Sequence, residues 1–179
     1  MQESELIRRA QDGDRDAMEE LLNTWYTPIF AYFYKNTGRY HLAKDLTQEA
    51  LIKTVLALNR YRYRPRAPFK SWLFAIVSNH LKNYYRTLSR HPEPDPLDED
   101  APAADTAFAR SEQRGDIGAA LARLPPEQRE ALVLRFYHGF SMREIAAVTG
   151  ARETTVKARV RYGLEKMKQE LEGYDVNEP

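Results

Sequence analysis

Apolar residues recur at three- and four-residue steps through most of residues 3 to 90, and this is the period of a buried helical stripe. The longest stripe comprises Ala17, Met18, Leu21, Leu22, Trp25, Ile29, Phe30 and Phe33. A second comprises Leu42, Leu46, Ala50, Leu51, Val55 and Leu58, and a third comprises Trp72, Leu73, Ile76, Val77 and Leu81. The first half of the chain is therefore predicted to be a bundle of helices.

The second half has a different pattern, in which proline, serine and glycine bound shorter helices. The segment 124–127 (L-P-P-E) opens a helix, because proline is favoured at the first helical position and an acid suits the helix N-terminus. Ser141 and Glu144 form a capping box ahead of a short helix that should end at Gly150. A longer helix follows over about 153–171. This order predicts a helix-turn-helix, although an ordinary helical hairpin has a similar pattern.

The long helix over 153–171 has two faces of different chemistry. Its apolar face carries Val156, Val160, Leu164, Met167 and Leu171. Polar and basic residues lie on the other side, and recognition helices present their N-terminal residues to the major groove. We expect base edges to be contacted by Lys157, Ala158 and Arg161. We expect phosphates to be contacted by Thr154, Thr155, Arg159 and Tyr162.

Charge is unevenly distributed along the chain, whose formal net charge is only +1. Residues 50–92 contain nine Lys or Arg and no Asp or Glu. Interleaved aromatic residues are Tyr61, Tyr63, Phe69, Trp72, Phe74, Tyr84 and Tyr85. Cations displace counterions from phosphates, and flat rings stack on unpaired bases. The segment therefore predicts a polynucleotide partner, although the apolar stripe favours a core position for Trp72.

The stretch that follows has the opposite charge. Residues 91–105 contain six acids, four prolines and no Lys or Arg. Proline and like-charge repulsion disfavour a helix, so a flexible connector is predicted over 91–106. It fits either a solubilising linker or an acidic arm that mimics nucleic acid in a basic channel. In both cases we expect an all-α protein with two small helical domains, 1–90 and 107–172, and a disordered tail over 173–179.

Composition excludes several classes of protein. The chain has no cysteine, so disulfides and thiolate metal sites are excluded. No apolar run approaches the ~20 residues that span a membrane. The N-terminus lacks the features of a signal peptide, and a cytoplasmic protein is expected. The four histidines are scattered and no phosphate-binding glycine loop occurs, so we expect no catalytic residue, metal or cofactor.

Four motifs, in this order, resemble those of the extracytoplasmic-function (ECF) group of bacterial RNA polymerase sigma factors. D-L-T-Q-E-A-L-I-K-T-V at 45–55 resembles the helix that binds core polymerase, and F-K-S-W-L-F-A-I-V-S-N-H-L-K-N-Y-Y-R at 69–86 resembles the promoter-melting segment. L-P-P-E-Q-R-E-A-L-V-L-R-F at 124–136 and E-T-T-V-K-A-R-V-R-Y-G-L-E-K-M at 153–167 resemble the −35-binding domain. The resemblance covers nearly the whole chain and implies a sigma factor that starts transcription at specific promoters.

The resemblance also implies roles for individual residues. Contact with the polymerase clamp helices is implied for Asp45, Gln48, Glu49 and Lys53, whose charges alone indicate only a solvated face. Binding of flipped −10 bases is implied for Asn79, His80, Lys82, Asn83 and Tyr84, and binding of the neighbouring phosphates for Arg62, Arg64, Arg66 and Arg86. The acidic connector is implied to enter the channel that later carries RNA. Two Tyr-Arg pairs before Pro65, and Arg161, depart from the family pattern and leave the promoter sequence open.

The partners that follow are core RNA polymerase and promoter DNA, both duplex and single-stranded. An anti-sigma factor is implied by the resemblance alone, and a monomer is expected outside the holoenzyme. The alternative is a stand-alone helix-turn-helix regulator that binds an operator without polymerase. It requires a ligand or dimer surface in the first half of the chain. An enzyme or a structural adaptor leaves the nine-cation segment unexplained.

Overall fold

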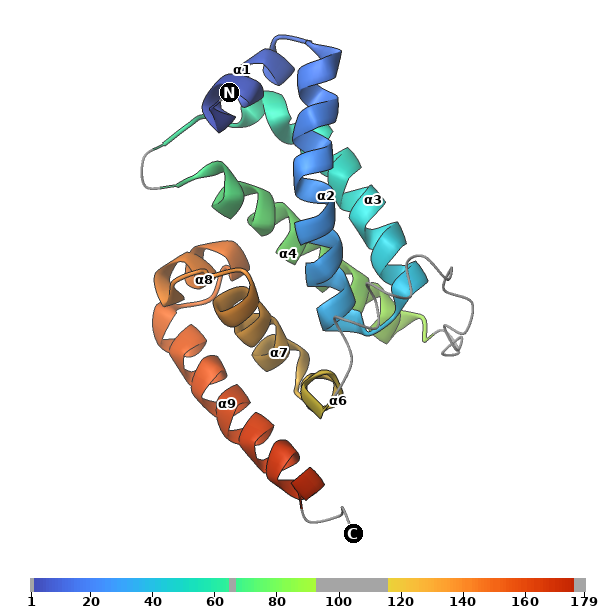
Figure 1. Ribbon diagram of the computed structural model, residues 1–179, viewed down its shortest axis with the longest axis vertical. Helices are drawn as coiled ribbons and strands as arrows, with labels where there is room; N and C mark the ends of the chain where they lie inside the picture. The colour runs from blue at the N-terminus through green and yellow to red at the C-terminus, as the bar shows by residue number, and fades with distance from the viewer. Residues whose placement is uncertain (1, 65–66, 93–115, 176–179) are drawn as a thin grey trace.

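The structure, a computed structural model, describes residues 2–64, 67–92 and 116–175, and no β-strand occurs within these ranges (Figure 1). The first half consists of α1 (Glu3–Gln11), α2 (Arg15–Thr37), α3 (Tyr40–Ala57), the 3-10 helix η1 (Leu58–Arg60) and α4 (Phe69–Arg90). The second half consists of α6 (Asp116–Ala122), α7 (Pro126–Leu132), the π-helical turn η2 (Val133–Tyr137), α8 (Met142–Thr149) and α9 (Glu153–Asp175). The predicted all-α fold class is confirmed.

Local signals in the sequence set several helix ends. The Asp14 carboxylate accepts a hydrogen bond from the Ala17 amide at 3.1 Å and caps the start of α2. The predicted capping box is present at α8, where the Glu144 amide donates to the Ser141 hydroxyl at 3.1 Å and the Ser141 amide donates to the Glu144 carboxylate at 2.8 Å. Gly150 ends α8 with φ of 73°, a left-handed conformation that favours glycine.

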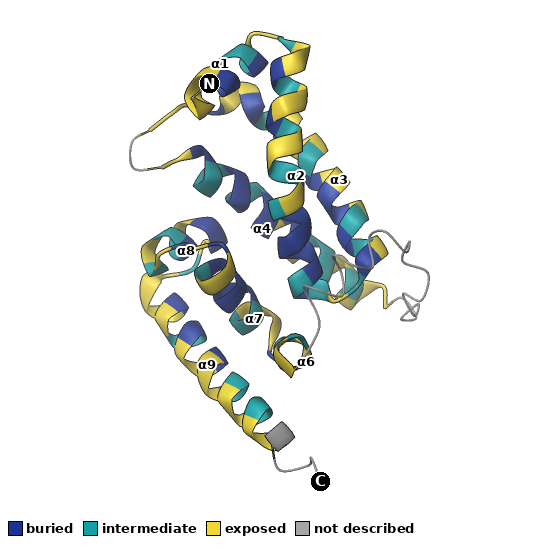
Figure 2. Ribbon diagram, viewed as in Figure 1, coloured by how far each residue is buried: buried dark blue, intermediate teal, exposed yellow. Residues whose placement is uncertain are grey.

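The core of the first half lies between α2, α3 and α4, whose facing sides are buried (Figure 2). Tyr32 and Phe33 of α2 and Phe74 of α4 are fully buried there. Their rings meet edge to face, with centroids 5.3 Å apart for Tyr32 and Phe33 and 5.8 Å apart for Tyr32 and Phe74. Aromatic pairs prefer this geometry, and it fixes the position of α4 against α2.

The second half is built on the close approach of α7 and α9. A Cβ atom on Gly163 would lie 3.1 Å from the Leu132 side chain, so a larger residue at position 163 would require that side chain to shift. Ile145 of α8 and Val156 of α9 are fully buried on either side of the Gly150 turn. The helices α8 and α9 therefore form the predicted helix-turn-helix.

The two halves pack directly against each other, with α8 on α4 and with α6 and α7 on α2 (Figure 1). The carboxylate of Glu130, which is only 5% exposed, accepts hydrogen bonds from the Tyr32 hydroxyl at 2.7 Å and from the Ser78 hydroxyl. Burial first, and then the Glu130 charge, raise the pKa of Tyr32 well above its usual value. Tyr32 therefore remains a hydrogen-bond donor to a carboxylate from the other half.

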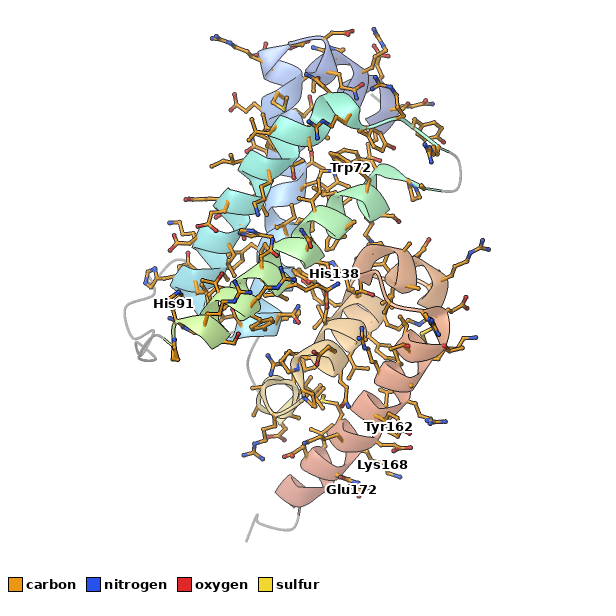
Figure 3. The ribbon with its side chains drawn as sticks, turned by 180° about the vertical axis from the view of Figure 1, so that it is seen from behind. Trp72, His91, His138, Tyr162, Lys168 and Glu172 are labelled. Carbon is orange, nitrogen blue, oxygen red and sulfur yellow. The ribbon has the colours of Figure 1, made fainter. Side chains whose placement is uncertain are left out.

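Further contacts between the halves involve lysines of α4. The Lys70 ammonium donates to the His138 carbonyl, and the Lys82 ammonium donates to the Thr149 carbonyl at the end of α8. The Phe74 ring packs against Phe140, with centroids 5.3 Å apart. Figure 3 shows His138 at the junction between the halves. Charged, polar and apolar groups together thus make a specific interface, which the sequence did not predict.

Three details differ from the sequence predictions. Val55, expected in a buried stripe, is 37% exposed, because Thr47 and Thr54 take core-facing positions of α3 and donate to carbonyls four residues earlier. Leu164, expected on the buried face of α9, is exposed, since it lines an open groove. Finally, α9 continues to Asp175, so residues 173–175 are helical and not part of a disordered tail. The connector predicted over 91–106 lies outside the described residues from 93 onward.

Candidate functional surfaces

The outer face of α3 combines charged and apolar side chains. Asp45, Gln48 and Glu49 are exposed there. Ile52 and Leu56 lie on the same face and are 61% and 78% exposed. Large apolar side chains open to solvent beside charges are typical of a protein-binding surface. Ile52 and Leu56 were not predicted as surface residues, although both fall on the otherwise polar side of the predicted helix.

The solvent-facing side of α4 carries some, but not all, of the residues expected to bind melted DNA. Asn79 and Arg86 are exposed, and Asn83 is partly buried. Tyr84 is partly buried, and its hydroxyl accepts a hydrogen bond from Arg39 at 3.3 Å. Tyr85 is also partly buried. The exposed residues of this set on α4 are thus Asn79, Lys82 and Arg86.

His80 lies about 100° around α4 from Asn79, on the flank that faces α3. It is 8% exposed, and its ring packs edge-on against Phe33 with centroids 6.1 Å apart. Its Nε2 lies 2.8 Å from the Glu49 carboxylate, and its Nδ1 lies 2.9 Å from the Lys53 ammonium. Burial first, with a contribution from Lys53, lowers the pKa of His80 despite the opposing effect of Glu49. The structure therefore joins a residue expected at the −10 DNA to two residues expected at the polymerase.

The segment between η1 and α4 is anchored at its start and exposed further on. The Tyr61 ring is buried against Phe69 and Trp72, with centroids 5.2 Å away in each case. Gln11 of α1 donates to the Tyr61 carbonyl at 3.0 Å. Arg62 and the two residues after it, Tyr63 and Arg64, are exposed. Arg66, the remaining arginine expected to contact phosphate, lies outside the described residues.

The first turns of α9 present the residues expected to read duplex DNA. Exposed side chains there are Thr154, Thr155, Lys157, Arg161 and Tyr162, and partly buried ones are Ala158 and Arg159. The Arg161 guanidinium lies over the Tyr162 ring, 4.9 Å from its centroid. Lys157 lies 3.5 Å from Glu153 one turn earlier, an exposed ion pair that contributes little to stability. Nothing in the described part of the chain covers this face of α9, so it is open to a partner.

An apolar groove of about 610 Å³ lies between α9, α6 and η2. It is lined by Ile117, Leu121, Phe136, Leu164 and Met167, among others. Lys168 and Glu172 also line the groove, and Figure 3 shows them toward the C-terminal end of α9. The sequence analysis treated the apolar residues of α9 as core and did not predict this groove.

Two kinds of site are absent from the described residues. No group of three or more His, Asp or Glu side chains in these ranges could hold a metal ion. None of the described helices is both long enough and apolar enough to cross a membrane. The surfaces that remain are a docking face, a basic helix with exposed amides, and a helix-turn-helix. Together they define a two-part, all-helical protein whose second half is a helix-turn-helix.

Comparison with known proteins gives the family. The sequence model for Sigma-70 region 2 matches residues 21–91, and that for Sigma-70, region 4 matches residues 114–167. The chain is 30% identical over 180 residues to the ECF RNA polymerase sigma factor SigD of Mycobacterium tuberculosis, covering 93% of this chain and 82% of SigD. The chain belongs to the ECF sigma factor family.

Two further comparisons extend this finding. The ECF sigma factor BldN of Streptomyces coelicolor is 29% identical over 158 residues, which cover 86% of this chain, and the chain spans only about three fifths (60%) of the length of BldN. The fold resembles that of the sigma factor RpoE of Bartonella quintana in complex with the anti-sigma factor NepR, with a TM-score of 0.66 and 22% identity. That likeness covers 86% of this chain and 96% of RpoE, and it supports the fold.

Proposed function

We propose that this protein is a sigma factor that binds core RNA polymerase, directs it to promoters and holds the melted −10 strand. One observation carries the proposal. This member of the family has both an exposed, partly apolar face on α3 and exposed side chains on the N-terminal turns of α9. Its action is binding in the cytoplasm, without bond-making. The proposal divides the chain into a polymerase- and −10-binding unit (1–90), a connector through the RNA channel (91–106) and a −35-binding unit (107–172).

The first unit would dock through α3 and capture bases through α4. Polymerase would contact Asp45, Gln48, Glu49 and Lys53 together with the apolar Ile52 and Leu56. The flipped −10 bases would contact Asn79, Lys82, Asn83 and Tyr84, and the phosphates Arg62, Arg64, Arg66 and Arg86. Unpairing costs a few kcal/mol, which stacking and hydrogen bonds to the captured bases offset, so melting is selective for sequence.

The second unit would read the −35 duplex through α9. Lys157 and Arg161 are exposed and Ala158 is partly buried near the start of the helix, where recognition helices meet base edges. Thr154, Thr155, Arg159 and Tyr162 flank them and suit phosphates. We further propose a monomer outside the holoenzyme and an anti-sigma partner, as in the RpoE complex with NepR.

The first test is gel filtration of the protein with bacterial core RNA polymerase that lacks any sigma factor. We expect stoichiometric co-elution, and loss of co-elution when Asp45 and Gln48 are both replaced by alanine. The matched control replaces Glu19 and Glu20, two exposed acids of α2, by alanine and should co-elute normally.

Two outcomes would contradict the proposal. Absence of co-elution by the wild-type protein, combined with tight binding of duplex DNA by the protein alone, would identify a stand-alone regulator. Equal co-elution of the Asp45→Ala, Gln48→Ala variant and the wild type would leave a sigma factor but move the docking site away from α3.

A further inference from the structure

His80 links the two helices that carry the proposed polymerase-binding and strand-capturing faces. Its ring nitrogens bond to Glu49 at 2.8 Å and to Lys53 at 2.9 Å, one helical turn apart on α3. Glu49 and Lys53 could pair directly with each other at this spacing. The imidazole of α4 lies between them instead. Both side chains also remain accessible on the outer face of α3.

The two partners fix the protonation state of the ring. The Lys53 ammonium can only donate, so Nδ1 must be an acceptor without a proton. The Glu49 carboxylate accepts, so Nε2 must carry the proton. One neutral tautomer satisfies both bonds, and the lowered pKa of His80 is consistent with it. The chain Lys53 to His80 to Glu49 is therefore fully paired, with no ring nitrogen left for a base.

We propose that His80 is a positioning residue that holds Glu49 and Lys53 in the geometry that core polymerase binds, and that it does not contact promoter DNA. The inference rests on the proposed function. Its physical basis is pre-organisation, because two long side chains that are already ordered lose less entropy on docking. The neighbouring Asn79, about 100° around α4, is exposed and keeps the proposed DNA-contacting role.

The test measures affinity for core polymerase with three variants of His80. His80→Leu fills the site against Phe33 but removes both bonds, and we expect about tenfold weaker binding from the lost ordering of two side chains. His80→Gln can still donate to Glu49, and His80→Asn can still accept from Lys53, so each should fall between the wild type and His80→Leu. In combination with Glu49→Gln, His80→Leu should cost less than it does alone, because the two residues act together.

A second readout separates positioning from DNA contact. Holoenzyme formed with excess core selects a preferred −10 sequence from a random pool of single-stranded DNA. His80→Leu should select the same sequence as the wild type, whereas Asn79→Ala should select a different or less defined one.

The outcomes distinguish the inference from the proposed function. If the wild type fails to bind core polymerase, the proposed function is wrong and this inference is wrong with it. If the wild type binds core polymerase, and folded His80→Leu and His80→Gln both bind it as tightly as the wild type does, only the proposed role of His80 is wrong. A changed −10 preference in His80→Leu with unchanged core affinity would assign His80 to DNA.

Discussion

His138 is surrounded by rings and cations where the two halves meet. Its ring centroid lies 4.8 Å from that of Phe74 and 6.1 Å from that of Tyr32. Burial first, then the charges of Lys70 and Lys35, lowers its pKa to about 3. An unfolded chain has a histidine pKa of about 6.5, so the unfolded state binds this proton first as the pH falls.

The pKa difference predicts a stability that depends on pH. The contribution from neutral His138 is complete above about pH 6.5 and is lost progressively as the pH falls toward 3. At pH 5 we expect a loss of roughly 2 kcal/mol from this group. Urea unfolding of the wild type and of His138→Gln at pH 7 and pH 5 measures this loss. The free energy of unfolding should fall less between the two pH values for the variant, because it has no histidine at position 138.

An equal loss in the wild type and in His138→Gln would contradict the assignment.

At the scale of a helix, α3 has a buried side and a side whose apolar residues have no partner in the described chain. Replacing Ile52 or Leu56 by serine should leave stability nearly unchanged, because both side chains are largely exposed. Affinity for core polymerase should fall about tenfold or more for each, since burying such a side chain is worth roughly 1.5–3 kcal/mol. Gel-filtration titration and urea unfolding measure the two effects.

The combined result decides between docking and folding. A serine variant that binds core polymerase more weakly but unfolds with the same free energy as the wild type supports a docking face on α3. The Glu19→Ala, Glu20→Ala variant again serves as the control and should bind normally. Reduced stability in either serine variant would instead mean that the residue supports the bundle.

The recognition helix α9 gives a prediction about specificity. Replacing Arg161 by alanine should cost about 1–3 kcal/mol in discrimination between the preferred −35 duplex and duplexes with single base changes. Replacing Arg159 should weaken binding to all sequences alike, as expected of a phosphate contact. Holoenzyme binding to duplexes chosen by selection from a random pool measures both. If Arg161→Ala weakened all sequences equally, Arg161 would be a phosphate contact too.

At the scale of the whole molecule, Glu130 holds the halves together. Its replacement by alanine leaves the hydroxyls of Tyr32 and Ser78 buried without their acceptor, which costs about 1–3 kcal/mol. We expect Glu130→Ala to increase the radius of gyration in small-angle X-ray scattering, because the halves separate. Glu130→Gln retains an acceptor and should have a smaller effect.

Glu127 provides the control on the same helix, because it is exposed. Glu127→Ala should match the wild type in scattering. If Glu130→Ala were as compact as the wild type, the interface would not depend on this carboxylate.

The features predicted from the sequence are those that short-range physics determines. Helical periodicity, the Ser141–Glu144 capping box and the Gly150 turn all depend on residues close in the chain, and each was confirmed. The family resemblance, also visible in the sequence, was confirmed by the family models. The site residues taken from that resemblance remain predictions.

What the sequence did not predict depends on contacts between distant segments. An acid such as Glu130 is expected at the surface from its sequence alone, and only the docking of α7 onto α2 and α4 buries it. His80 was expected from the sequence to contact −10 bases, yet its side chain faces α3 and bonds to Glu49. Ile52 and Leu56 could not be assigned to a core or a surface, because the helix carries apolar residues on more than one face.

The packing of α8 on α4 has a consequence for the population of binding-competent molecules. The −35 and −10 positions are about 25 base pairs apart, or roughly 85 Å along straight duplex DNA. Under the proposed function, helices in direct contact cannot reach both positions, so the closed form would compete with the promoter, and Lys82 would donate either to the Thr149 carbonyl or to DNA. The apparent dissociation constant for a promoter then equals the intrinsic one divided by the fraction of open molecules. Under the proposed function, each hydrogen bond between the halves would therefore lower the occupancy of promoters.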